Sequence, residues 1–216
     1  MTSEPASAAA ASVQAPQAYP IRVTVALPEK SSRLLNFPLF IGTFIRYILM
    51  IPHMIVIALV GLVAVIVYFI ATFAILFTGR FPAGMFRFVA GWQRWSTSVG
   101  AYFFGLADAY PPFSTEQAGY PVVYEADYTD KSNRILNFPL FGLYIKELLL
   151  IPHLFVLAAL ALIGFVVLFV AQFAVLFTGQ FPAGMHNYLA GVLRWSTRLN
   201  GYIYALTDRY PPFSLN

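Results

Sequence analysis

Two long segments without a charged residue constrain the fold of this chain more than any other feature. They run from Met54 to Thr78 and from Leu154 to Thr178. As an α-helix, each would be roughly 37 Å long, which exceeds the ~30 Å hydrocarbon core of a bilayer and allows a tilted crossing. The composition agrees, because 59% of the residues are hydrophobic and only 10% are charged, whereas soluble domains carry about a quarter charged residues. The pattern predicts a membrane protein.

The two segments belong to a duplicated unit. Residues 51–114 align with residues 151–214 without a gap and are identical at more than half of the positions. We therefore expect two tandem units related by pseudo-twofold symmetry. The units are residues 19–114 and 120–216, joined by a linker at residues 115–119. Residues 1–18 are rich in Ala, Ser and Pro and contain no Lys or Arg, so we expect a disordered tail and not a cleaved secretory signal.

Each unit opens with a segment of alternating polarity, YPIRVTVALP in the first and YPVVYEADY in the second. A period of two favours strands, which we expect to pair with each other at the membrane surface. NFPLFIGTFIRYILM follows, with Pro38 suited to the first turn of a helix and Arg46 as its one charge; the counterpart segment carries Lys146 and Glu147. Because this segment is short for a span, we expect an interfacial helix that ends at Pro52, and likewise at Pro152.

The decapeptide LFTGRFPAGM, from Leu76 to Met85, recurs as LFTGQFPAGM from Leu176 to Met185. It contains a glycine suited to close one helix, a proline suited to start the next, and a glycine that allows close approach. The sequence therefore predicts a tight helical hairpin at one membrane surface in each unit. The predicted turn residues are Gly79, Pro82, Gly84, Gly179, Pro182 and Gly184.

Residues 83–107 and 183–207 follow the turns, and the sequence leaves open whether they cross the bilayer or lie at its surface. Each carries a polar stripe on an apolar helix. An interfacial helix would turn the stripe to the headgroups, whereas a crossing helix would turn it toward other helices, water or lipid phosphate. The stripes are Arg87, Arg94 and Ser98 in the first unit and Asn187, Arg194 and Arg198 in the second.

Basic residues precede both units at equivalent positions: Lys30 and Arg33, then Lys131 and Arg134. Equal flanking charge favours an even number of crossings per unit, with both units parallel. We expect a multi-pass protein of the inner (plasma) membrane with four crossings and cytoplasmic termini. A shallow hairpin in each unit is the other even arrangement.

Two groups of side chains are candidates for binding. An arginine offers a planar fork for phosphate, and a neighbouring tryptophan favours headgroup depth. We therefore expect lipid or partner contact, or as an alternative interhelical hydrogen bonds, from Arg87, Arg94, Trp95, Arg194, Trp195 and Arg198. The histidines of the twin IPH motifs, His53 and His153, could ligate a haem, a chlorophyll or a metal between the units. The simpler interpretation is a polar residue at a helix start near the headgroups.

Other chemistry has little support in the sequence. Asp108 and Asp208 precede the twin YPPFS segments, where a surface turn explains them better than a proton relay. The chain contains no cysteine, which excludes disulfides and thiolate sites. It contains no phosphate-cradling glycine loop, nucleophile elbow or nucleic-acid module. We expect no enzymatic activity, no cofactor, no metal and no nucleic-acid partner.

The order of IPH, LFTGRFPAG, RW and YPPFS resembles that of the bacterial membrane proteins grouped as domain of unknown function 4389. The likeness covers both units, nearly the whole chain after residue 18, although Gln180 departs from the basic residue usual in LFTGR. The resemblance implies a tandem-unit integral membrane protein. The family has no established activity, so the resemblance implies no catalytic residues.

The sequence thus predicts an all-α integral membrane protein: two tandem pseudo-symmetric helical hairpin units with interfacial helices and a short surface β-strand pair. The favoured function is a non-enzymatic scaffold, lipid-contacting protein or accessory subunit, with membrane lipids, other membrane subunits or a second copy as partners. One alternative is a small transporter or channel with a pathway at the repeat interface. The other is a cofactor-binding subunit that uses His53 and His153.

Overall fold

The computed structural model describes residues 18–216, so nearly all of the predicted tail lies outside the described residues. The chain forms β1 (Ile21–Val25), α1 (Ile41–Thr78), α2 (Ala83–Phe103), β2 (Val122–Ala126), α3 (Phe141–Thr178) and α4 (Ala183–Ile203). The protein is mostly helical, with one small sheet, as expected. Among the described helices, α1 and α3 are long and apolar enough to span a membrane, by length and composition.

The predicted break at Pro52 is wrong, because α1 continues through this residue and α3 continues through Pro152. A proline inside a helix removes the N–H that would bond to the carbonyl four residues earlier. Beside this interruption, the hydroxyl of Tyr110 donates to the Leu49 carbonyl at 2.9 Å. A tertiary contact from the segment after α2 therefore supports α1 beside the proline. Pro38 lies before the first turn of α1 and not in it.

The predicted hairpin turns are present in both units. Gly79 ends α1 with φ 71° and donates its N–H to the Ile75 carbonyl at 2.7 Å, and Gly179 ends α3 with φ 72°. Pro82 and Pro182 are the residues immediately before α2 and α4. The prediction for the second glycines is wrong: a Cβ on Gly84 or on Gly184 would meet no heavy atom of residues 18–216 within 4 Å. These two glycines are therefore not sites of close approach.

The two predicted strands pair with each other in antiparallel register, with Val23 opposite Tyr124. Their inner face is buried, whereas the outer face carries Arg22, which pairs with Glu125 at 3.1 Å and with Asp127 at 2.7 Å. Each strand packs on the second helix of the other unit, β1 on α4 and β2 on α2. The duplicated units therefore exchange their strands across the pseudo-twofold axis.

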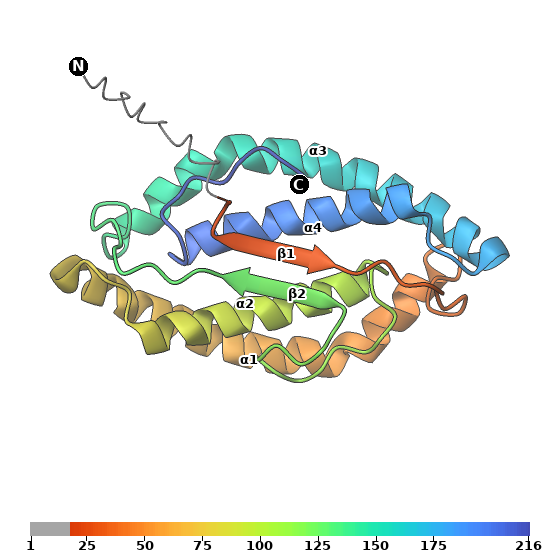
Figure 1. The fold of residues 1–216 in the computed structure, drawn as a ribbon, viewed down its shortest axis with the longest axis horizontal. Helices are drawn as coiled ribbons and strands as arrows, with labels where there is room; N and C mark the ends of the chain where they lie inside the picture. The colour runs from red at the N-terminus through yellow and green to blue at the C-terminus, as the bar shows by residue number, and fades with distance from the viewer. Residues whose placement is uncertain (1–17) are drawn as a thin grey trace, which may run out of the picture.

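The elements form layers, which Figure 1 displays from the sheet side. The sheet and its connecting loops lie in front, α2 and α4 lie behind them, and α1 and α3 are outermost. All four helices run along the long axis of the molecule (Figure 1). The main core joins the inner face of the sheet, α2 and α4, and the C-terminal halves of α1 and α3. The structure is thus a slab with a polar sheet on one face and the most apolar helices farthest from it.

The two units run in opposite directions along the slab. The Ser31 N–H donates to the Gly179 carbonyl at 2.9 Å, and the Ser132 N–H donates to the Gly79 carbonyl at 2.9 Å. The segment before each long helix therefore lies at the end of the other long helix, and the two hairpin turns lie at opposite ends of the molecule (Figure 1). The predicted combination of four crossings with parallel units is wrong, because helices that crossed the bilayer in this fold would invert one unit relative to the other.

Candidate membrane-contacting surface and its polar anchors

The exposed surface of α1 and α3 is almost entirely apolar and carries no charge except Glu147 on α3, because the other two charged residues of these helices, Arg46 and Lys146, are buried. The exposure extends to both helix ends, since Ile41 is 46% and Phe77 is 77% exposed in α1, while Phe141 is 66% and Phe177 is 77% exposed in α3. Exposed apolar patches larger than a few hundred Å² mark surfaces that another apolar phase or partner covers. At ~1.5 Å per residue, each helix presents such a surface over roughly 57 Å.

The opposite face of the slab is charged. Arg22 on β1 bonds to two carboxylates, Glu125 and Asp127, and all three side chains are more than 40% exposed. Hydrogen bonds from the Arg22 guanidinium hold the pKa of Asp127 below its ordinary value. This face is therefore suited to water.

The arginines of the predicted stripes lie under the sheet. Arg94 donates to the Tyr124 carbonyl on β2 at 3.2 Å and to the Thr115 carbonyl at 2.8 Å. Arg194 likewise donates to the Val23 carbonyl on β1 at 2.9 Å. An exposed carbonyl row at a sheet edge needs donors, and each arginine supplies one to the strand of the other unit.

The remaining residues of that predicted set are divided between interior and surface. Arg198 donates to the Ser214 carbonyl at 3.3 Å. Trp95 and Trp195 are buried, whereas Arg87 is exposed. Contact with headgroups stays a prediction, and Arg87 is the residue whose exposure would allow it. The hydrogen bonds of Arg94, Arg194 and Arg198 are not the interhelical bonds named as the alternative, because their acceptors lie on strands and loops.

His53 lies inside an aromatic cluster that joins three sequence motifs. The Trp95 indole N–H donates to His53 Nδ1 at 3.1 Å, and the Phe113 ring stacks on the imidazole with centroids 3.7 Å apart. Because Nδ1 accepts this bond, Nε2 carries the ring proton and donates to the Pro111 carbonyl at 3.0 Å. The IPH, RW and YPPFS motifs thus meet at one point, where the histidine fastens α1 to α2 and to the loop after it.

The second unit repeats the cluster with one difference. Trp195 donates to His153 Nδ1 at 2.9 Å, and Phe213 stacks on the ring at 3.7 Å. The other ring nitrogen, Nε2, has no hydrogen-bond partner within residues 18–216. In both clusters the lone pair of Nδ1 is occupied by an indole, so a metal or haem iron would have to displace a buried hydrogen bond.

No set of three or more metal-ligating side chains occurs among residues 18–216 that could hold an ion. The two histidines instead lie in separate apolar clusters, each inside its own unit. The cofactor hypothesis for His53 and His153 is untested, and their observed hydrogen bonds describe a structural role.

Sequence reasoning missed a buried polar network behind these clusters. The Arg46 guanidinium, 1% exposed, forms an ion pair with Asp108. It also donates to the carbonyls of Leu35 at 3.0 Å, Tyr102 at 2.7 Å and Ala107 at 2.9 Å. Asp108 is therefore an anchor for a buried charge and not only a surface turn. The sequence did contain a signal for this network: Arg46 is an isolated charge on an apolar helix, and a buried charge requires a partner.

The equivalent network in the second unit is built differently. The Lys146 ammonium donates to the Asn137 side-chain carbonyl at 2.6 Å, and the Asn137 amide donates to Asp208 at 2.7 Å. One asparagine thus stands between cation and carboxylate. The two networks are related by the repeat but differ in how directly the charges meet.

At the repeat interface, α2 packs against α4 behind the exchanged strands. The hydroxyls of Thr97 and Thr197 lie 3.5 Å apart across it, and a Cβ on Gly100 would contact the Leu193 side chain at 3.4 Å. A transport pathway along this interface would require the two helices to separate. The transporter hypothesis stays a prediction.

Comparison with known proteins agrees with the motifs. A family model described as "Domain of unknown function (DUF4389)" matches residues 41–115 and 142–214. Each match runs from the start of a long helix to the end of a YPPFS segment. No match is found among curated proteins or among solved structures.

Proposed function

This chain belongs to the DUF4389 family, with two copies of its domain, and we propose that it is a non-enzymatic, lipid-contacting membrane protein whose four helices lie in the plane of one leaflet. In this arrangement α1 and α3 are immersed in acyl chains and the sheet faces water. Its role is that of an anchored scaffold, which displays the sheet and loops to partners at the membrane surface. The observation that carries the proposal is the position of the charged sheet over the middle of α2 and α4.

Arg94 and Arg194 lie near the centres of α2 and α4, and both bond to the strands. If these helices crossed the bilayer, the sheet would lie near its midplane. The ion pairs of Arg22 would then be surrounded by hydrocarbon, where each charge costs several kcal/mol. With the helices in plane, the same charges are hydrated.

The length of the apolar surface also supports the in-plane arrangement. To keep a helix of roughly 57 Å inside a ~30 Å core, its axis would have to tilt by about 60° from the membrane normal. Spanning helices tilt by about 20° on average and rarely by more than about 40°. A less tilted helix would expose Ile41 or Phe77 to water, although both are apolar.

Flanking charge gives a third argument. The basic residues before the two units lie at opposite ends of the slab, because Ser31 contacts the end of α3 and Ser132 contacts the end of α1. Crossing helices would expose equal positive clusters on both sides of the membrane, against the positive-inside bias. In the plane of a leaflet, the pseudo-twofold axis lies along the membrane normal and both clusters face the same side.

The multi-pass arrangement in the inner membrane remains the alternative, with its units inverted. Placement in the inner membrane with the described ends of the chain on the cytoplasmic side is part of the proposal. Both ends lie on the sheet side: Tyr19 bonds to the Arg209 carbonyl at 3.0 Å, and the Leu215 carbonyl accepts a bond from Arg194. In the in-plane arrangement, both described ends of the chain therefore lie on the same side of the membrane, which agrees with the sequence-based expectation.

Single-cysteine labelling tests the proposal cleanly, because the chain has no cysteine of its own. Arg80→Cys and Gln180→Cys place one thiol on each exposed hairpin turn, and Thr24→Cys places one on the outer face of the sheet. Each variant is treated with a membrane-impermeant maleimide in sealed right-side-out and inside-out vesicles. All three thiols are expected to react from one and the same side.

Labelling of the two turns from opposite sides, with the sheet position protected in both kinds of vesicle, would establish crossing helices and overturn the in-plane arrangement. Reaction of all three variants in detergent is the control for accessibility. A chain that is released from membranes by alkaline extraction would contradict the lipid-contacting role itself.

A further inference from the structure

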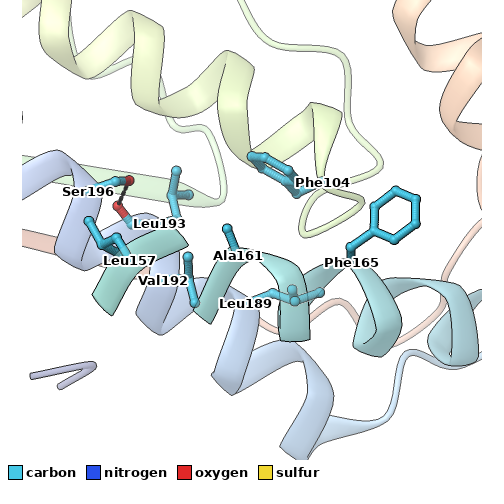
Figure 2. Close-up of a pocket in the computed structure, with 9 residues that line it drawn as sticks. Phe104, Leu157, Ala161, Phe165, Leu189, Val192, Leu193 and Ser196 are labelled. Atoms are coloured by element: carbon cyan, nitrogen blue, oxygen red, sulfur yellow. Dashed lines mark hydrogen bonds between the residues drawn. The ribbon is translucent and has the colours of Figure 1, made fainter. Parts of the chain in front are cut away.

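An apolar cavity of about 270 Å³ lies between α3 and α4 in the second unit. Figure 2 shows Leu157, Ala161 and Phe165 of α3 on one side, with Val192 of α4 and Phe104, which follows α2, completing the wall. Polar lining is limited to Ser196, whose hydroxyl donates to the Leu193 carbonyl at 2.8 Å. The cavity therefore offers shape and apolar contact to a guest but no charge.

The first unit fills the equivalent place with its own side chain. Trp92 is the counterpart of Val192, and Gly61 is the counterpart of Ala161. The Trp92 indole packs so closely on Gly61 that a Cβ there would lie 3.1 Å from its Nε1. The same indole meets the Tyr204 ring edge-on at 5.0 Å, and Tyr204 corresponds to Phe104. One copy of the repeat thus carries a plug that the other copy lacks.

From this difference we propose that the second-unit cavity is a binding site for one acyl chain of a membrane lipid. The inference rests on the proposed function, since it requires α3 to face the lipid phase. The cavity is larger than the ~150 Å³ cavities that hold a benzene molecule, and far too small for a whole lipid. A single flexible hydrocarbon chain, entering from the side of α3, fits both limits.

The surroundings of the cavity specify this occupant. Phe165 lines the cavity and is 58% exposed, and its neighbour Leu162 is 71% exposed. The mouth is therefore continuous with the surface that the proposed function places among acyl chains. Even in the filled copy, the Trp92 indole N–H has no hydrogen-bond partner within residues 18–216, so this place in the repeat is apolar whether a side chain or a guest occupies it.

The experiment uses the full chain in phosphatidylcholine vesicles that contain a phosphatidylcholine with a diazirine on one acyl chain. After irradiation, the labelled residues are identified by mass spectrometry. Leu189 and Leu193 line the cavity and are otherwise buried; Val89 and Gln93 are their buried counterparts in the filled copy. Label is expected on the first pair and only at background level on the second.

Two variants test whether the side chain at position 92 or 192 decides which unit has the open cavity. The double substitution Val192→Trp with Ala161→Gly rebuilds the plug of the first unit and should reduce label at Leu189 and Leu193 to background. Trp92→Val removes the original plug and should bring label to Val89 and Gln93. Circular dichroism of each variant checks that the helices remain, and the plugged variant matches a packing that the chain already tolerates.

The exposed Phe177 separates the two proposals. Label at Phe177 in every variant, with Leu189 and Leu193 unlabelled in the native chain or unchanged in the plugged variant, would overturn the acyl-chain site and leave the lipid-contacting role intact. Absence of label at Phe177 as well would contradict the proposed function.

Discussion

Replacing Asp108 with asparagine removes the carboxylate that pairs with the buried Arg46 guanidinium. Loss of one partner from a buried ion pair costs about 3–5 kcal/mol, because it leaves the other charge unpaired in a medium that solvates it poorly. The structure favours the low end of this range. The Asp108 side chain is 18% exposed, and three backbone carbonyls continue to accept bonds from the guanidinium. We expect a loss of about 3 kcal/mol.

The same substitution in the second unit is the matched comparison. Asp208 meets Lys146 only through the Asn137 side chain, and Lys146 keeps its 2.6 Å bond to Asn137 when the carboxylate becomes an amide. Asp208→Asn therefore weakens charge-assisted hydrogen bonds without leaving a directly paired cation alone. The expected loss is about 1–2 kcal/mol.

Both variants can be measured by reversible unfolding in mild detergent with increasing dodecyl sulfate, followed by circular dichroism and tryptophan fluorescence. Asp108→Asn is expected to be the more destabilising of the two substitutions by about 1–2 kcal/mol. Equal losses, or a larger loss for Asp208→Asn, would refute the argument that the direct ion pair sets the difference between the copies.

Four further substitutions have defined outcomes. Trp95→Phe leaves a buried histidine nitrogen without its donor and should cost about 1–3 kcal/mol in the same unfolding assay; no loss would contradict the structural role of that bond. Gly42→Ala should impair folding, because its Cβ would lie 2.4 Å from a backbone oxygen, whereas Gly84→Ala should be neutral or slightly stabilising. Pairing with Arg22 lowers the pKa of Asp127, so the ionised pair stabilises the fold at pH values above the ordinary aspartate pKa of ~3.9. This stability is lost as the pH falls through the lowered pKa of Asp127. Arg22→Ala should remove this acid dependence, which a pH series of thermal unfolding would detect.

The features predicted correctly from the sequence depend on local signals. The alternation around Val23 and Tyr124 predicted two strands, and these residues face each other in the sheet. Gly79 was predicted to end a helix, and it ends α1 with a φ of 71°. The duplication itself predicted which parts of the two units would be alike, and the paired aromatic clusters follow it.

Features that depend on distant contacts were predicted poorly. The sequence does not reveal that Tyr110 bonds to a carbonyl beside Pro52 and that packing supports the helix there. It also does not reveal that Arg46 finds its carboxylate 62 positions later. Each of these depends on a side chain brought close only by the completed fold.

The direction of the second unit is a further case. A repeat implies a symmetry axis but does not specify whether that axis lies along the helices or across them. The contacts of Ser31 with Gly179 and of Ser132 with Gly79 decide it, because they place the start of each unit beside the hairpin turn of the other. For the same reason the sequence left open what the polar stripe of Arg94 would face, and its observed acceptors are carbonyls of the other unit's strand and of the linker.

The orientation of the helices relative to the bilayer is the central claim, and oriented circular dichroism of the protein in aligned phospholipid bilayers measures it directly. Because all four helices share one long axis (Figure 1), their signals add and do not cancel. The in-plane arrangement predicts the spectrum of helices perpendicular to the membrane normal. A spectrum of helices aligned close to the normal would contradict the account.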